Sequence, residues 1–119
     1  MIVENTSNEK ISALVEKQRT FFNSEATLSY EFRLEQLRKF RRALKHWHRP
    51  LCDALWADLH KSEQEAVLTE LSIVEGEVKN HIRHLKGWMR GQKLSTPLKM
   101  MPSKSYIISE PLGCALIIA

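Results

Sequence analysis

Apolar residues recur at three- and four-residue steps through most of this chain, and each such run predicts an amphipathic helix. The first run covers residues 8–23. The second starts near Thr27 or Ser29, either of which could cap a helix, and ends before Pro50, because the residue before a proline is pushed out of the helical region. Pro50 is then well placed to open a third, short helix that carries apolar residues as far as Leu59.

The longest helix is expected after Ser62, which forms an S-x-x-E capping box with Glu65. Gly76 interrupts this helix at a cost of about 1 kcal/mol relative to alanine, which is tolerable if a neighbouring helix packs closely there. The apolar seam contains Val67, Leu71, Val74, Val78, Ile82, Leu85 and Trp88 or Met89. The pattern therefore predicts a mainly α segment of about four helices.

The pattern changes over Ser105–Ala119, which reads SYIISEPLGCALIIA. Tyr106–Ile108 are strand formers, Pro111 breaks the run, and Cys114–Ala119 is an unbroken apolar stretch typical of a strand buried on both faces. Residues 92–104 contain two prolines and are expected to form an extended connector. The helices are thus followed by a predicted β-strand pair, and a strand buried on both faces needs further layers, so the chain should open a larger α/β domain.

The composition limits the classes of protein to which the chain could belong, but it indicates no particular activity. The chain has 119 residues, 43% hydrophobic and 27% charged, with a formal net charge of +4, which permits anionic partners but does not argue for them. Cys52 and Cys114 lack CxxC spacing; reduced thiols are the expectation, with a single bridge as the alternative. The sequence shows no secretory signal and no apolar run near the ~20 residues needed to cross a bilayer. We expect a cytoplasmic protein without membrane contact from this segment.

The densest charge lies in Arg38–Arg49, RKFRRALKHWHR. One interpretation is a helical interaction module that binds acidic partners through this face, with Trp47 available for stacking. The other, which we favour, is the solvated face of an amphipathic helix partly offset by Glu31 and Glu35. We therefore expect no nucleic-acid partner.

Candidate metal ligands and nucleophiles are few. His81 and His84 share one side of a helix, and His60 could join them, but no spacing specifies a third ligand, so no metal site is predicted. Cys114 lies in the apolar run, where a buried thiol is inert, and Cys52 is expected to pack in the core. The three tryptophans, Trp47, Trp56 and Trp88, are likewise expected to be core anchors.

Several stretches carry a family resemblance in unbroken order, from about Ile11 onward. They are LVEKQRTFFNS (14–24), LSYEFRLEQLRKFRRAL (28–44), ALWADLHKSEQEAVLTEL (54–71), HIRHLKGWM (81–89) and SKSYIISEPLGCALIIA (103–119). The chain resembles the N-terminal portion of the aldehyde dehydrogenase superfamily, in particular its class 3 and fatty aldehyde branch. The most specific pieces are Asp58–Lys61 and the EPLG at Glu110–Gly113.

The resemblance implies an enzyme that oxidises aldehydes to carboxylic acids with NAD or NADP, as a homo-oligomer. Ile118 and Ala119 match the end of a strand that borders the cofactor cleft, in agreement with ligand binding at the carboxyl ends of α/β strands. Neither Cys52 nor Cys114 matches the nucleophile's position, and the general base and oxyanion asparagine of the family lie beyond these residues. No catalytic residue is assigned, and the chain alone is expected to be inactive and to bind no cofactor.

The resemblance also divides the chain. Residues 1–92 would be an N-terminal helical segment, and residues 93–119 an extended connector with the first strands of an incomplete cofactor-binding domain, which in the family is α/β and Rossmann-like. One departure concerns Glu25, where the family often has glycine, so the first helix is expected to end without a left-handed cap.

Overall fold

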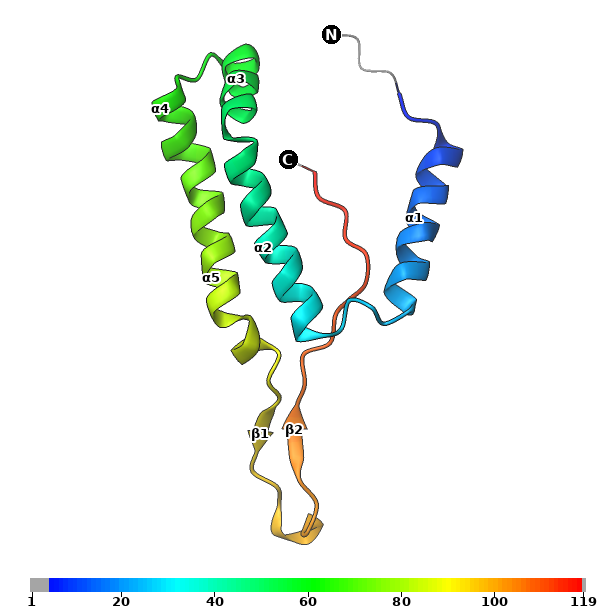
Figure 1. Cartoon of the computed structure of the whole chain (residues 1–119). Coiled ribbons are helices and arrows are strands. Elements are labelled where there is room, and N and C mark those ends of the chain that lie inside the picture. The colour runs from blue at the N-terminus through cyan, green and yellow to red at the C-terminus, as the bar shows by residue number, and fades with distance from the viewer. Residues whose placement is uncertain (1–4, 119) are drawn as a thin grey trace.

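The computed structural model describes residues 5–118 and has an open, elongated shape (Figure 1). Four helical rods are followed by a two-stranded antiparallel hairpin, which confirms the predicted fold class. The radius of gyration is 20.3 Å and the extents are 66 × 39 × 21 Å. A compact domain of this length would have a radius of gyration of about 13–14 Å. The helices therefore leave much of their apolar surface uncovered.

Helix α1 (Asn8–Asn23) has the predicted bounds, and the Ser7 hydroxyl accepts from the backbone N–H of Lys10 at its start. After the helix, Glu25 adopts a left-handed conformation with φ +61°. The expectation that this helix ends without a left-handed residue is therefore wrong, because the turn needs that conformation and glutamate takes it at a steric cost. None of the α1 residues is buried.

Helix α2 (Tyr30–His46) is capped by Ser29, whose hydroxyl accepts from the Phe32 N–H at 3.1 Å; Ser29 is one of the two predicted caps. Helix α3 (His48–Leu59) begins at His48, earlier than the predicted start at Pro50. The proline is tolerated because it lies in the first turn, where the backbone N–H needs no partner within the helix. His60, with φ +54°, ends α3 in the left-handed region.

The predicted longest helix is a continuous rod made of α4 (Glu63–Ala66), the π-helical segment η1 (Val67–Leu71) and α5 (Ser72–Trp88). Ser62 caps it by accepting from the Glu65 N–H at 3.2 Å, as the capping box predicts. The π segment was not predicted. At its end the Ser72 N–H bonds to the Val67 carbonyl, while the Ser72 hydroxyl donates to the Leu68 carbonyl at 3.0 Å. The hydroxyl thus takes the acceptor that the backbone N–H of a regular α-helix would use.

The main packing joins α2 to α5, which run side by side (Figure 1). Val78 and Leu85 of the predicted seam are buried, and Leu34, Leu37 and Leu44 of α2 are half-buried. A Cβ at Gly76 would meet nothing within 4 Å, so no helix packs closely against this glycine among the described residues. The small core confirms the helical stripes but not every predicted anchor. Trp47, Trp56 and Trp88 are 56%, 56% and 49% exposed, which makes the core assignment of the tryptophans wrong in this structure.

The hairpin differs from the predicted strand pair. Strand β1 (Gln92–Leu94) pairs with β2 (Ser105–Ile107), with Lys93 opposite Tyr106, and the short helix η2 (Leu98–Met100) lies in the connection between them. Residues 92–94 therefore form a strand instead of belonging to an extended connector. Residues 114–118 are assigned to no helix or strand, because they have no ladder partner within residues 5–118. Their assignment to a sheet interior stays a prediction.

Candidate functional site

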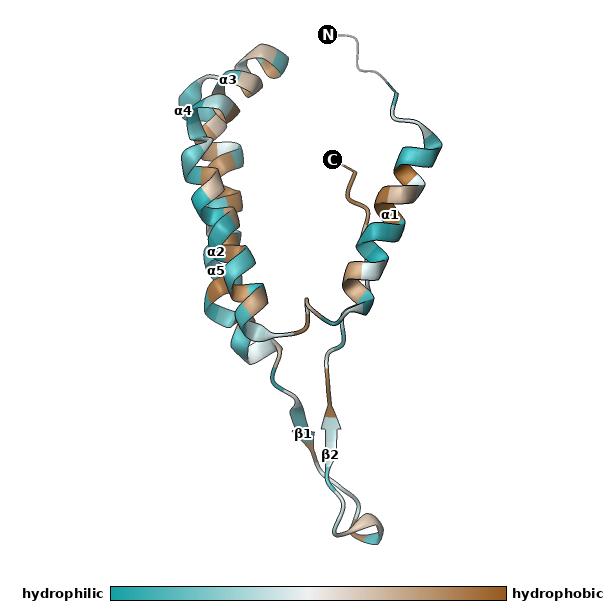
Figure 2. Ribbon diagram, turned by 45° about the vertical axis from the view of Figure 1, so that its right-hand side comes forward, coloured by the Kyte–Doolittle hydropathy of each residue, from teal (hydrophilic) through white to brown (hydrophobic). Residues whose placement is uncertain are grey.

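Ile118, one of the two residues predicted to border a cofactor, lies at the end of the apolar terminal segment, which we define as residues 112–118. Ile118 is 87% exposed, and Ala119 lies outside the described residues. Leu116 and Ile117 are each 85% exposed. In Figures 1 and 2 this segment runs between α1 and the α2–α5 pair, and Figure 2 colours it strongly hydrophobic. An apolar segment with this much exposed surface can bury that surface against another part of a protein.

An open apolar groove of about 670 Å³ lies where α1, α2 and the terminal segment approach one another. Aromatic rings dominate its wall, and the centroids of Phe21 and Phe32 are 6.1 Å apart. Gly113 and Cys114 of the terminal segment complete the lining. The groove has the mainly apolar lining of a packing surface. Its polar lining residues are Gln18, Thr27, Arg33, Gln36 and His81, and no carboxylate lines it.

The basic face of residues 38–49 is partly neutralised within the chain. Arg42 pairs with Glu35 at 2.9 Å, and Arg41 lies 3.5 Å from Glu75 on α5. Glu75 also accepts from Lys79 at 3.1 Å. The hydrogen bond from Lys79, with a further contribution from Arg41, lowers the pKa of the Glu75 carboxyl. These pairs fit a solvated, ion-paired helix face; polyanion binding through this face stays a prediction.

The histidines singled out by their spacing do not form a metal cluster. The Nδ1 atoms of His81 and His84 lie 2.8 and 2.9 Å from the carbonyls of Glu77 and Asn80 one turn earlier. Both rings also pack against Trp88, one edge-on and one stacked. His60 contacts the ring of Trp56 instead.

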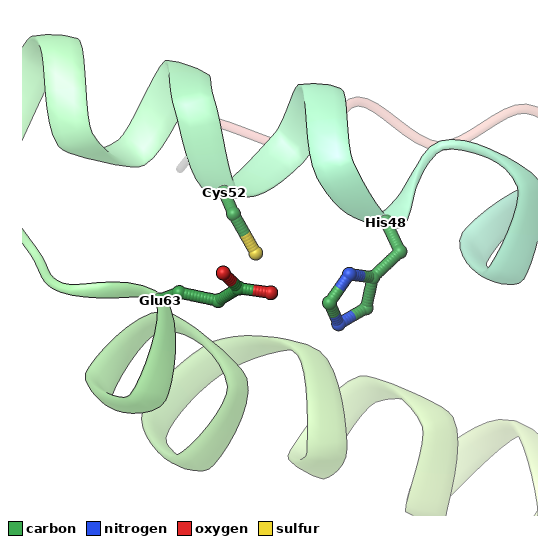
Figure 3. A group of neighbouring side chains, drawn as sticks. All are labelled: His48, Cys52 and Glu63. Carbon is green, nitrogen blue, oxygen red and sulfur yellow. The ribbon is translucent and has the colours of Figure 1, made fainter.

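A different group of ligand-type side chains does come together, and Figure 3 shows it: His48, Cys52 and Glu63. Their ligand atoms all lie within 4.8 Å of one another, and within residues 5–118 this is the one such group. His48 and Cys52 are four residues apart on α3, a spacing that is present in the sequence but that the expected helix boundary at Pro50 had divided between two helices. Glu63 comes from α4, and its approach depends on the turn between the helices, which sequence reasoning did not supply.

Both cysteines are free, as expected from their spacing. Cys52 is 4% exposed, which confirms its prediction as a packing residue. Cys114 is exposed, so the expectation that it is buried among aliphatic side chains is wrong for this structure. The terminal segment around it would have to be covered before that thiol became inaccessible.

No helix within residues 5–118 combines the length and apolar character required to traverse a bilayer.

No protein-family profile matches the chain. Individual proteins do. The chain is 41% identical over 101 residues to 4,4'-diaponeurosporen-aldehyde dehydrogenase of Staphylococcus aureus, covering 85% of this chain and 22% of that protein. It is 37% identical over 113 residues to aldehyde dehydrogenase family 3 member I1, chloroplastic, of Arabidopsis thaliana, covering 95% of this chain and 20% of that protein. It is 38% identical over 109 residues to the dog protein named aldehyde dehydrogenase, dimeric NADP-preferring, covering 92% of this chain and 24% of that protein.

Among solved structures, the substrate-bound state of Staphylococcus aureus AldH superposes with a TM-score of 0.82 at 35% identity, covering 91% of this chain and 23% of that one. Sequence and fold agree that this chain is a segment of the aldehyde dehydrogenase class. Within that class, the relatives whose names include family 3 place the chain with that family, which confirms the resemblance inferred from the sequence. The chain spans between 20% and 24% of the length of these relatives.

Proposed function

We propose that this chain is the N-terminal part of an NAD- or NADP-dependent aldehyde dehydrogenase that oxidises an aldehyde to a carboxylic acid in the cytoplasm. The observation that carries the proposal is the joint match in sequence and fold, 35% identity with a TM-score of 0.82 over 91% of the chain. Chance similarity of a helical pair would not extend through the turns and the hairpin as well. The name of the dog relative, which includes the words dimeric and NADP-preferring, supports a homo-oligomer and a nicotinamide cofactor.

In this proposal the segment has a structural role in the enzyme. The α2–α5 pair and α1 supply helical layers, and the terminal segment supplies a strand whose end, Ile118 and Ala119, borders the cofactor. Ile118 has an aliphatic side chain, which can form part of a wall but cannot hold a phosphate or a ribose hydroxyl. These residues would therefore not form a nucleotide site without other segments, so we expect no cofactor to bind to this chain alone and derive no catalytic step from it.

The test is a segment exchange. The stretch of the dog relative that aligns with this chain is replaced by this sequence, and aldehyde-dependent formation of NADPH is measured. Retained activity in the chimera supports the proposal, because only a segment that packs correctly can support the rest of the enzyme. A chimera that is soluble and oligomeric but inactive counts against it. A matched chimera carrying Leu85→Asp in the α5 core should lose activity, and the 119-residue chain alone should form no reduced cofactor.

The competing proposal, an interaction module with the basic face of residues 38–49 as its binding surface, has a separate test. Binding to a polyanion should weaken with salt and be lost when Arg38, Arg41 and Arg42 are reversed in charge. We expect no measurable salt-dependent binding by the unmodified chain, because Arg41 and Arg42 already have carboxylate neighbours.

A further inference from the structure

The group His48, Cys52 and Glu63 joins an imidazole, a thiol and a carboxylate at the junction of α3 and α4 (Figure 3). We propose that these three side chains bind one zinc ion, which fastens the end of the rod that begins with α4 to α3. The inference is independent of the dehydrogenase proposal, because it uses only these residues and the two helices that carry them.

The backbone supplies the right arrangement for such a site. Residues four apart on a helix project from the same face, so His48 and Cys52 form a two-ligand clip on α3. Glu63 is the first residue of α4 and is fixed by the Ser62 cap, which accepts from the Glu65 N–H. The left-handed His60 reverses the chain between the two helices and brings Glu63 opposite the clip. Two elements are therefore linked by a single set of ligands.

The distances are within reach of coordination. Tetrahedral zinc bonds of about 2.0–2.3 Å place neighbouring ligand atoms about 3.3–3.8 Å apart. The ligand atoms here lie within 4.8 Å of one another, so closure needs a shift of about 1 Å. Cys52 is buried and would stay in place, whereas His48 is half-buried and Glu63 exposed, so these two side chains can move onto the ion.

The charges also balance. A Cys52 thiolate and the Glu63 carboxylate together neutralise a divalent cation, and His48 binds as the neutral ring. Arg49 is a competing cation beside the cluster, with Nε 3.0 Å from Asp53 Oδ1 and Nη1 3.2 Å from Glu63 Oε2. Asp53 offsets that charge. The contact uses one oxygen of Glu63 and leaves Oε1 for the metal, so Arg49 can orient the ligand from outside. Lys61 lines the cavity beside the cluster and pairs with Glu70, so its positive charge is also offset.

A cavity of about 240 Å³ beside the cluster, lined by Cys52 and Glu63 among others, has room for a water molecule as the fourth ligand. The Cys52 S–H bond breaks, its proton passes to solvent or buffer, and the sulfur electron pair forms the zinc bond. Zinc is preferred over magnesium or calcium because thiolate and imidazole are poor ligands for those hard cations.

The experiment titrates the metal-free chain with Co²⁺ as a spectroscopic probe and then with Zn²⁺ by calorimetry in two buffers of different ionisation enthalpy. We expect one ion per chain, a thiolate-to-cobalt charge-transfer band, displacement of cobalt by zinc, and release of a proton from Cys52 on binding. Cys52→Ser should abolish the band. His48→Ala and Glu63→Gln should each weaken binding by about 100-fold or more, since even supporting residues cost 10–100-fold.

The matched controls are Cys114→Ser, which removes the other thiol, and His46→Ala, which removes a neighbouring imidazole outside the cluster. Both should leave the affinity and the band unchanged. The proposal is overturned if no band forms, if the band survives Cys52→Ser, or if Cys114→Ser removes it. Should circular dichroism show that Cys52→Ser loses helix, the exposed Glu63→Gln variant decides, and unchanged affinity there overturns the site.

Discussion

The exposed terminal segment favours self-association of the isolated chain, and the strength of that association can be measured. Leu116 and Ile118 are 85% and 87% exposed. Full burial of such a side chain contributes about 1.5–3 kcal/mol, so covering the exposed part of both contributes about 2.5–5 kcal/mol. We expect the isolated chain to self-associate through this segment. The double change Leu116→Asp and Ile118→Asp should then weaken association by roughly a hundredfold to a few thousandfold, because each 1.4 kcal/mol is a factor of ten.

Sedimentation velocity over a range of concentrations measures the effect. The control changes Leu98 and Met100 at the hairpin tip to Asp; these are 88% and 61% exposed and also apolar, but they lie away from the terminal segment. The control should associate like the unmodified chain. If the unmodified chain stays monomeric at every concentration, or if the hairpin control dissociates oligomers equally, the reasoning about the terminal segment is refuted.

Three further predictions concern the helical part, each checked by denaturant unfolding of the variant against the parent. Glu25→Gly should stabilise the fold by about 1 kcal/mol, since glycine takes φ +61° without strain; an unchanged or lower midpoint contradicts the left-handed turn. Gly76→Ala should stabilise α5 by up to about 1 kcal/mol, because the added methyl meets nothing within 4 Å; destabilisation would reveal a neighbour packed at that site. Glu75 has a lowered pKa, held down first by Lys79 and then by Arg41, so the folded state binds fewer protons there than the unfolded state. Its contribution is present above about pH 4.5, the ordinary value, and is lost as the pH falls through the folded pKa; Glu75→Gln should flatten this part of the stability profile, and an unchanged profile refutes the assignment.

Local signals predicted the helices well because they act over a few residues. Hydroxyl caps at Ser29 and Ser62 have the predicted hydrogen bonds, and α1 has the predicted bounds. The predictions failed where a competing side-chain hydrogen bond or a partner distant in the sequence determines the backbone conformation. The π segment depends on the Ser72 hydroxyl taking a carbonyl, and residues 92–94 became a strand because β2 lies opposite them.

The candidate sites divide in the same way. The family resemblance could assign Ile118 and Ala119 to the edge of a cofactor site, but Ile118 is exposed and Ala119 lies outside the described residues, so this assignment stays a proposal. The cluster of His48, Cys52 and Glu63 was not predicted, because the expected boundary at Pro50 put His48 and Cys52 on different helices, whereas α3 begins at His48 and carries both. The third depends on how α3 and α4 are joined, and no periodicity reports that.

The central claim is that the terminal segment is covered in the assembled enzyme, and the thiol of Cys114 reports on it most directly. Cys114 is exposed here, whereas Cys52 is buried and serves as an internal reference. Alkylation rates are compared between the dilute, monomeric chain and the active chimera, with mass spectrometry resolving each peptide. We predict that Cys114 reacts fast in the chain and slowly in the chimera, while Cys52 reacts slowly in both. Equally fast labelling of Cys114 in an active chimera would contradict the account.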